Sequence, residues 1–592
     1  MASHDEHLQS IRAGYDLGER PSITLGAANV GDTVHADTHV RLPLSMMNRH
    51  GLIAGATGTG KTKTLQGIAE QLSENGVPVF LADIKGDLSG LATPGEPSEK
   101  LLERTASVGM DWQPTAFPVE FLALGGDGVG VPVRATIDSF GPLLLARVMG
   151  LNETQETSLQ LMFHWADQRE LPLDDLKDLK AVVSYLTSDE GKAELKEIGG
   201  VATSTANVIL RQLTALEAGG MDAFFGVPEF DTAELLRLAP DGRGVISCLE
   251  LPTLQSKPQL FSTFMIWLLA DLFAELPEAG DLDKPKLVFF IDEAHLVFKG
   301  ASKAFLDSIT TTVRLIRSKG VGLFFVTQTP QDVPAEVLGQ LANRVQHALR
   351  AFTPQDATAL KATVRTFPTS DYDLETVLTS AKVGEAVVTV MDPDGAPTPV
   401  ALTRMWAPRS LMDPSTPATM EAVLKASDLM EVYGEEEDRE SAFEMLAAQK
   451  AAAESAGAES AGRAAADAGA GPVPTGSRAR TGHVADGRAD HEHGIDAAAR
   501  EMGWGEDGDG AGSGERRRRV SDLDAEPARQ TRTRSSGTAS RKRTETQARS
   551  DFDRALGNFM KSAGTQLGRE VMRSAFGTKR RKGGGLLGKI FG

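Results

Sequence analysis

A ten-residue stretch, GATGTGKTKT (residues 55–64), carries the residue types that hold a nucleotide's phosphates. It contains the full pattern G-x-x-x-x-G-K-[ST], between an apolar run, GLIA, and a segment with apolar residues at helical spacing. In such a loop the backbone N–H groups face the phosphates, the lysine reaches the β- and γ-phosphates, and the hydroxyl binds Mg²⁺. The predicted binding residues are Gly55, Ala56, Thr57, Gly58, Thr59, Gly60, Lys61, Thr62 and Lys63, with Thr62 also at the metal.

Two acidic residues, Asp292 and Glu293, directly follow a second apolar run, LVFFI (residues 287–291). A buried strand that ends in this way would present both carboxylates at the carboxyl edge of an α/β sheet, where such sheets bind ligands. We therefore expect Asp292 to hold Mg²⁺, directly or through water, and Glu293 to polarise the attacking water. The alternative is that the two acids only cap the helix that follows.

Three further polar residues have spacings that fit nucleotide hydrolysis. Gln328 ends a third apolar run, GLFFVTQ, so its amide would contact the γ-phosphate or the water, unless it only forms a turn. Arg314 and Arg317 lie near the end of a predicted helix, where they would complement the helix dipole. Alternatively, one of them reaches the nucleotide of a neighbouring subunit as an arginine finger.

The elements that must position these residues alternate between apolar strands and amphipathic helices, which is typical of a mainly parallel α/β sheet. Between about residues 139 and 242, successive helical segments replace that alternation and predict a helical insertion. The predicted organisation is a short N-terminal β segment (1–45), the first part of the core (46–138), the insertion (139–242), the second part of the core (243–410), a helical stalk (411–456), a disordered linker (457–550) and a basic amphipathic helix (551–592).

Composition narrows the class of protein. One cysteine, Cys248, excludes an intrachain disulfide framework, and the sequence has neither a secretory signal pattern nor an apolar run long enough to span a membrane. We therefore expect a soluble, cytoplasmic protein. The net charge is −19, with 62 Lys+Arg against 81 Asp+Glu, which argues against a surface that coats nucleic acid non-specifically. It leaves open a basic pore or arm.

Two related classes of nucleotide-dependent protein fit the motifs less well. Residues 292–295 read DEAH, but the second nucleotide-binding lobe and the arginine-rich motif of two-lobed helicases are missing from the sequence. The Asn-Lys-x-Asp pattern of guanine recognition is missing too, so the expected nucleotide is ATP. A small-molecule kinase is also disfavoured, because the sequence has no signature of an acceptor site.

The set GATGTGKT, FLADIKGD, VFFIDEAH, RLIRSKGVGLFFVTQTP and LANRVQHALRAF resembles the HerA/FtsK superfamily of P-loop ATPases, and in particular its bacterial HerA-like branch. The resemblance extends from about residue 22 to 408. It implies a RecA-like ATPase that assembles as a ring, usually a homo-hexamer, with double-stranded DNA in a central pore. It also implies that Asp292 and Glu293 form the Walker B pair, that Gln328 is the sensor, and that Arg317, with Arg314 second, is the finger.

The resemblance has departures that bear on the substrate. The residues before Gly55 are too few for the N-terminal β-barrel of archaeal relatives, and the membrane helices and winged-helix DNA reader of FtsK-type pumps are missing from the sequence. A translocating DNA motor is therefore the first expectation. The alternative is a nucleotide-dependent switch or scaffold that controls a protein or membrane partner.

The end of the chain has the opposite charge balance to the rest. Residues 511–592 contain 20 Lys+Arg against 8 Asp+Glu. Such a tail would follow nucleic-acid phosphates, lie on an anionic membrane, or dock on a protein, its own ring included. The sequence does not choose between these partners.

Overall fold

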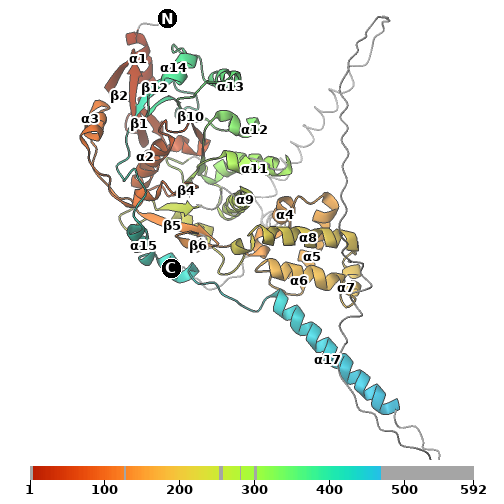
Figure 1. Ribbon diagram of the computed structural model, residues 1–592. Coiled ribbons are helices and arrows are strands. Elements are labelled where there is room, and N and C mark those ends of the chain that lie inside the picture. Colours follow the sequence, from red (N-terminus) through yellow and green to blue (C-terminus); the bar gives the residue numbers. More distant parts are fainter. Residues whose placement is uncertain (1–3, 126–127, 252–257, 281, 299–302, 469–592) are drawn as a thin grey trace, which may run out of the picture. The chain divides into compact units, whose positions relative to one another are not determined.

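Twelve strands form one sheet in the part of the chain that the computed structural model describes, which comprises residues 4–125, 128–251, 258–280, 282–298 and 303–468. Their order across the sheet is β2-β1-β12-β11-β10-β3-β9-β8-β4-β7-β5-β6 (Figure 1). The strands are β1 (Ser22–Val30), β2 (Thr33–Pro43), β3 (Gly51–Ala54), β4 (Val79–Asp83), β5 (Val119–Leu124), β6 (Val131–Val133), β7 (Ile246–Glu250), β8 (Leu287–Ile291), β9 (Val321–Thr327), β10 (Asn343–His347), β11 (Glu385–Thr389) and β12 (Ala401–Met405).

The strands from β10 to β6 in this order are parallel, and β11, β12, β1 and β2 extend the sheet with antiparallel pairs. The prediction of a mainly parallel α/β sheet is therefore confirmed. Strand β9 lies between β3 and β8, with Ala54 opposite Thr327 and Ile291 opposite Phe325. The carboxyl ends of these three strands consequently meet at one edge of the sheet.

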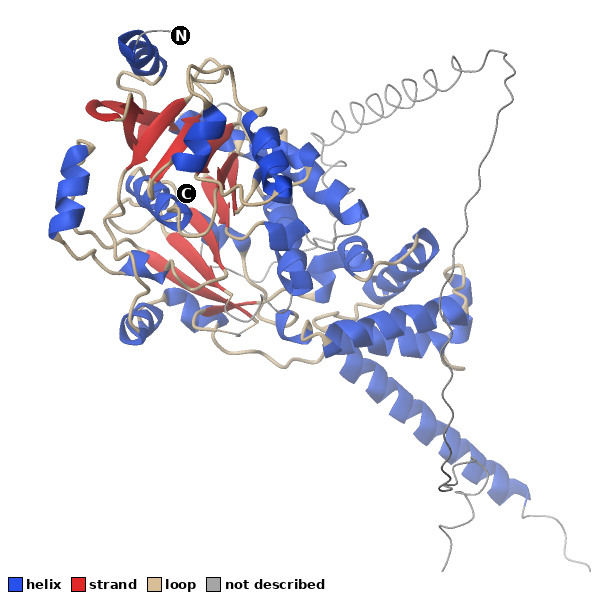
Figure 2. Ribbon diagram, turned by 45° about the horizontal axis from the view of Figure 1, so that its top comes forward, coloured by secondary structure: helices blue, strands red, loops and turns tan. Residues whose placement is uncertain are grey.

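The central strands are apolar throughout because helices cover both faces of the sheet (Figure 2). Successive residues of a strand point to opposite faces, so Phe289 and Phe325 belong to one buried cluster and Phe290 and Phe324 to the other. Helix α2 packs in the second cluster, together with the N-terminal strands. Helix α9 packs in the first, together with the helical insertion.

Helices alternate with the strands and also form the segment between residues 139 and 242. Those of the core, with the short 3-10 helices that matter for the site, are α2 (Lys61–Glu74), α3 (Glu99–Ser107), α9 (Pro258–Glu275), α10 (His295–Phe298), α11 (Lys303–Ile316), η6 (Arg317–Lys319), α12 (Ala335–Leu338), α13 (Pro354–Val364), α14 (Leu374–Ser380) and η1 (Leu44–Arg49). Those between residues 139 and 242, or overlapping that range, are α4 (Ile137–Val148), α5 (Glu153–Gln168), α6 (Leu176–Thr187), α7 (Lys192–Glu197) and α8 (Thr203–Ala218).

The N-terminal segment differs from the expectation of short strands alone. It begins with a helix, α1 (His4–Gly14), which buries Ile11, and it continues into the two strands β1 and β2. These strands are long and join the large sheet through β12 instead of forming a separate unit. Their apolar residues are buried in the core, which explains why they pair there.

The segment expected to be a helical stalk (411–456) contains three helices, α15 (Pro417–Lys425), α16 (Asp428–Tyr433) and α17 (Ala442–Ala468). The first two carry residues that are buried against the core, including Met420 and Tyr433. Residues Met1–Ala453 belong to one compact unit, and the second unit, Glu454–Phe559, is described only as far as Ala468. The rest of the expected linker and the expected C-terminal helix (551–592) lie outside the described residues.

Candidate nucleotide-binding site

The glycine-rich loop connects the carboxyl end of β3 to the first turn of α2, as its sequence predicts. Gly60 precedes the helix with a φ of 112°, a conformation that L side chains rarely adopt. A Cβ added to Gly55 would lie 2.5 Å from the Cβ of His347. Glycine is thus required at both positions, at one for the turn and at the other for the close approach of β10.

Lys61 is the first residue of α2, and its side chain bends back over the loop. Its Nζ donates to the carbonyl oxygens of Gly55, at 2.7 Å, and of Ala56, at 3.3 Å. Burial lowers the pKa of Lys61, and the nearby ammonium of Lys85 lowers it further, whereas Glu293 and Asp292 raise it. The ammonium is therefore next to the acid pair while its own hydrogen bonds are made to loop carbonyls.

His347 supports the loop from behind. It is fully buried, with Nε2 3.0 Å from the hydroxyl of Thr64 and Nδ1 3.0 Å from the carbonyl oxygen of Glu385. Burial lowers the pKa of His347 to about 4, so the ring is neutral at pH 7. The carbonyl acceptor assigns the proton to Nδ1, and Thr64 then donates its hydroxyl hydrogen to Nε2.

Lys63, the last residue of the predicted phosphate site, has a different partner. Its Nζ donates to the carbonyl oxygen of Met412 and to Gln66 Oε1. Residues 409–412, which we call the strap, are hydrogen-bonded to the α2 side chains of Lys63, Gln66 and Glu70. A role for Lys63 at the phosphates stays a prediction, and its contacts are those of a residue that fastens the strap to α2.

The two acids follow β8 directly, and both are almost entirely buried. Glu293 has a φ of 46°, a strained conformation for a residue other than glycine, and such strain is often found at functional sites. Burial raises the pKa of Asp292 to about 6, although the neighbouring Lys85 opposes this effect. Asp292 Oδ2 and Glu293 Oε2 form no hydrogen bond with any described residue, although His295 Nδ1 lies 3.2 Å from the latter.

Lys85 is a member of this site that we did not predict from the sequence. Its Nζ lies 2.5 Å from Glu293 Oε1 and 3.6 Å from Asp292 Oδ2. Burial alone would lower the pKa of Lys85, but the two carboxylates outweigh it and raise the pKa. In the sequence, Lys85 stands two residues after the apolar run VFLAD (residues 79–83), within the segment FLADIKGD that carries part of the family resemblance.

Gln328 directly follows β9, between the ends of the phosphate-loop strand and the acid-pair strand. Its side chain is exposed, while its neighbours are held in place. Asp332 accepts hydrogen bonds from the Thr327 hydroxyl, at 2.7 Å, and from the backbone N–H of Thr329, at 2.9 Å. Strand order thus brings Gln328 to the same edge as Lys61, Asp292 and Glu293.

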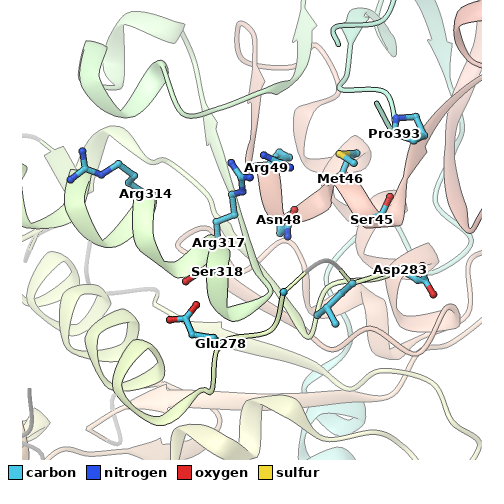
Figure 3. A pocket seen from close by; sticks show the side chains of 12 residues that line it. Ser45, Met46, Asn48, Arg49, Glu278, Asp283, Arg314, Arg317, Ser318 and Pro393 are labelled. Atoms are coloured by element: carbon cyan, nitrogen blue, oxygen red, sulfur yellow. The ribbon is translucent and has the colours of Figure 1, made fainter. Parts of the chain in front are cut away.

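The two predicted finger arginines lie at the opposite edge of the sheet. Arg314 lies in the last turn of α11, and Arg317 begins η6, just before the amino end of β9. Together with Arg49, which precedes β3, they line a cavity of about 770 Å³ (Figure 3). Glu278 and Asp283 are its acidic residues. In a single subunit, the amino edge of the sheet therefore holds the arginines and the carboxyl edge holds the phosphate loop.

His50, next to Arg49, is fixed beneath these arginines. Its Nε2 donates to the carbonyl oxygen of Val313 at 2.7 Å, and its Nδ1 accepts from the backbone N–H of Leu323 at 3.1 Å. Burial lowers the pKa of His50 to about 4, so the ring is neutral at pH 7. A neutral ring with both nitrogens bonded connects α11 to the start of β9, which positions the arginines between them.

The family to which the chain is similar agrees with its motifs and its sheet. Residues 29–503 match the family described as "Helicase HerA-like C-terminal". The chain belongs to this family. The resemblance inferred from the motifs is thereby confirmed, and so is the P-loop type of the α/β fold.

Solved structures similar to this HerA-like chain include a bacterial conjugative coupling protein, TrwBΔN70, at 14% identity, covering 70% of this chain and 95% of that chain, with a TM-score of 0.46. TrwB in complex with ADP and Mg²⁺ is similar to the same degree, at 14% identity over 70% of this chain and 96% of that chain, with a TM-score of 0.46. VirB4 of Thermoanaerobacter pseudethanolicus is 15% identical, covering 68% of this chain and 99% of that chain, with a TM-score of 0.42. No protein of curated function matches the chain.

The described residues contain neither a cluster of metal ligands nor a membrane-spanning helix. Among them, no group of three or more His, Cys, Asp or Glu residues is arranged to hold a metal ion. No helix of the described part of this HerA-like chain is long and apolar enough to cross a membrane.

Proposed function

We propose that the chain is the ATP-hydrolysing subunit of a ring-shaped motor that acts on double-stranded DNA. The observation that carries the proposal is the separation of the arginines from the phosphate loop, which lie at opposite edges of one sheet. A subunit with this arrangement needs the arginine edge of a neighbour to complete its nucleotide site. Membership of a family described as helicase-like supports DNA as the polymer.

In this proposal the loop from Gly55 to Gly60 holds the phosphates of ATP through its backbone N–H groups. Lys61 exchanges the carbonyl oxygens of Gly55 and Ala56 for the β- and γ-phosphates. Thr62 and Asp292 would hold Mg²⁺, which, when bound, neutralises charge on the phosphates. The buried Oδ2 of Asp292, without a hydrogen bond to any described residue, fits a metal ligand.

Glu293 is the residue that we propose to orient the attacking water and to accept its proton. Gln328, from the strand between the phosphate loop and the acid pair, would contact the γ-phosphate or that water. Arg317, with Arg314 beside it, would neutralise developing charge in the site of the neighbouring subunit. Each of these roles requires a head-to-tail contact between subunits.

The proposed assembly is a cytoplasmic homo-hexamer with double-stranded DNA in its central pore. An anionic membrane or a protein partner is the corresponding expectation for the basic tail, which lies outside the described residues. The rival function is a nucleotide-dependent switch or scaffold that does not move DNA.

The test is the ATPase rate of the purified full chain, with and without double-stranded DNA, over a range of salt concentrations. DNA should increase the rate, and the increase should fall as salt rises because phosphate contacts release counterions. A Lys61→Ala preparation gives the background. Normal basal hydrolysis that no nucleic acid stimulates would contradict the DNA motor and favour the switch, whereas wild-type hydrolysis no higher than this background would contradict both.

A further inference from the structure

The turn that carries Lys85 is held by a single buried carboxylate. Asp83 Oδ1 accepts hydrogen bonds from the backbone N–H groups of Lys85, at 3.1 Å, and Gly86, at 2.8 Å. Its Oδ2 accepts one from the backbone N–H of Leu88 at 2.8 Å. Gly86 has a φ of 72°, which lets the chain reverse at this point. The direction in which Lys85 leaves the end of β4 is thus determined by its own turn.

Strand pairing explains why Lys85 meets the acid pair. β4 and β8 are parallel neighbours, with Ala82 opposite Ile291. Lys85 and Glu293 therefore both follow the ends of adjacent strands. The ammonium touches Glu293 Oε1 at 2.5 Å, where the glutamate side chain is 11% exposed and the lysine side chain 36% exposed.

This ion pair opposes the role proposed for Glu293. Lys85 donates a charge-assisted hydrogen bond to Oε1, so a water could reach this oxygen only by taking the place of the ammonium. The other oxygen, Oε2, lies 3.2 Å from His295 Nδ1. In the absence of nucleotide, Lys85 therefore occupies one carboxylate oxygen of Glu293, and His295 lies beside the other.

The same ammonium lies 3.6 Å from Asp292 Oδ2, the oxygen that fits a metal ligand. A divalent cation held by Asp292 would bring a second positive charge next to Lys85, and phosphates would bring negative charge that competes for the ammonium. Both changes favour separation of Lys85 from Glu293.

We propose that Lys85 is a positioning residue that pairs with Glu293 in the empty site, and that binding of Mg²⁺ and nucleotide breaks this pair. The base is then available only in a loaded site, which limits reactions of a partly filled one. This inference rests on the proposed function, because it assumes that the site takes a nucleotide with its metal.

A double-mutant cycle with Lys85→Met, Glu293→Gln and both together tests the pair. In the presence of EDTA and without nucleotide, the shifts of the thermal unfolding midpoint should be non-additive. The midpoint of the double variant should fall by less than the sum of the decreases in the two single variants. Lys85→Arg should keep the coupling, because it keeps the charge. Lys100→Met, at an exposed lysine, combined with Glu293→Gln gives the additive control.

The second measurement is the Kd of a fluorescent ADP with Mg²⁺ for the same four proteins. If binding must break the pair, Lys85→Met should lower the Kd by a larger factor in the wild-type background than in the Glu293→Gln background. The two factors should differ about tenfold. The comparison removes any direct effect of Lys85 on the phosphates, because that effect is present in both arms.

The outcomes separate the inference from the function on which it rests. Additive midpoints in EDTA would show that no pair exists, and equal Kd ratios would show that binding leaves the pair intact. Either result overturns the inference while wild-type ATP hydrolysis still supports the proposed function. Failure of the wild type to hydrolyse ATP would contradict the proposed function whatever the midpoints are.

Discussion

Lys61 and Lys63 illustrate how much two residues of one motif differ once their partners are known. Among the described residues, the ammonium of Lys61 donates hydrogen bonds to carbonyl oxygens of its own loop, next to Asp292 and Glu293. That of Lys63 bonds to the carbonyl oxygen of Met412 in the strap. In the proposed function, the first contacts are exchanged for phosphate oxygens, whereas the second connects two segments of the fold.

We therefore expect Lys61→Ala to abolish nucleotide binding with little change in stability, because its hydrogen bonds are made to carbonyl oxygens of its own loop. Lys63→Ala should bind nucleotide with nearly the wild-type Kd and unfold at a lower temperature, because the strap loses a hydrogen bond to α2. Fluorescent-nucleotide titration and thermal unfolding of both variants test these two predictions. Loss of binding in Lys63→Ala without a change in unfolding would instead assign Lys63 to the phosphates.

At this scale the sequence predicts residues within a local motif better than residues whose partners are distant. The phosphate loop is a single continuous pattern, so its geometry between a strand and a helix was predictable. Lys85 meets Glu293 only because β4 and β8 become neighbours in the sheet, and nothing local to either residue indicates that pairing. The site roles of Asp292, Gln328 and the two arginines stay predictions, although strand order explains where each lies.

Helix α2 is the element that links the phosphate loop to the rest of the fold, and Glu70 is central to that link. Its buried carboxylate accepts hydrogen bonds from the backbone N–H groups of Arg409, at 2.9 Å, and Ser410, at 3.0 Å, and from the Ser410 hydroxyl at 2.5 Å. Glu74, one turn further along α2, pairs with the Arg409 side chain at the surface.

Glu70→Ala should lower the free energy of unfolding by about 2–4 kcal/mol, because it leaves buried donors of the strap without an acceptor. Glu74→Ala should cost less than about 1 kcal/mol, because a partly exposed ion pair contributes little. Chemical denaturation of both variants measures the difference. Equal effects would mean that the strap is not fastened through Glu70.

The carboxyl ends of β4 and β7 bring two acids into register, with Asp83 opposite Glu250. Burial raises the pKa of Glu250 from an ordinary value of 4.5 to about 7, and the nearby Asp83 adds to the effect. The folded state thus binds a proton that the unfolded state releases between pH 4.5 and 7. Stability contributed by this group therefore falls as pH rises through that window.

Glu250→Gln removes the titration, so the variant should be more stable than the wild type at pH 8, by on the order of 1–3 kcal/mol. The difference should shrink below pH 7 and vanish near pH 4.5. Unfolding free energies of the two proteins across this pH range provide the measurement. A difference that does not change with pH would show that Glu250 does not titrate in that range.

Among the elements, apolar runs predicted the central strands because burial on both faces makes those strands apolar throughout. The region after residue 410 was predicted less well, since α15 and α16 are short and each buries few residues, such as Met420 in α15 and Tyr433 in α16. A polar segment with isolated apolar positions resembles an exposed stalk in sequence. Only the packing of those positions shows that it covers the core.

At the scale of the whole molecule, the two edges of the sheet carry different candidate functional residues. The carboxyl edge carries the phosphate loop and the acids, and the amino edge carries Arg49, Arg314 and Arg317 around a cavity. In the proposed ring, the amino edge of one subunit faces the carboxyl edge of the next. A finger variant and a phosphate-loop variant therefore damage opposite sides of the same contact.

Arg317→Ala and Lys61→Ala should each be inactive as pure proteins, and mixing them should restore part of the ATPase activity. Restoration is expected because a mixed ring contains contacts in which an intact Arg317 faces an intact Lys61. Arg314→Ala mixed with Lys61→Ala shows which arginine acts across the contact. No recovery from subunits that demonstrably co-assemble would contradict a role in trans.

In the proposed ring, the placement of the arginines and the phosphate loop at opposite edges also determines how the ATPase activity should depend on protein concentration. A subunit that provides its arginines at one edge and its phosphate loop at the other makes a contact that is not self-complementary. Two copies alone therefore complete at most one nucleotide site. Every further copy adds one complete site until closure of the ring adds the last. On dilution, the rate of ATP hydrolysis per subunit should therefore fall, because dissociated subunits still bind nucleotide but have no neighbour whose arginine completes the site.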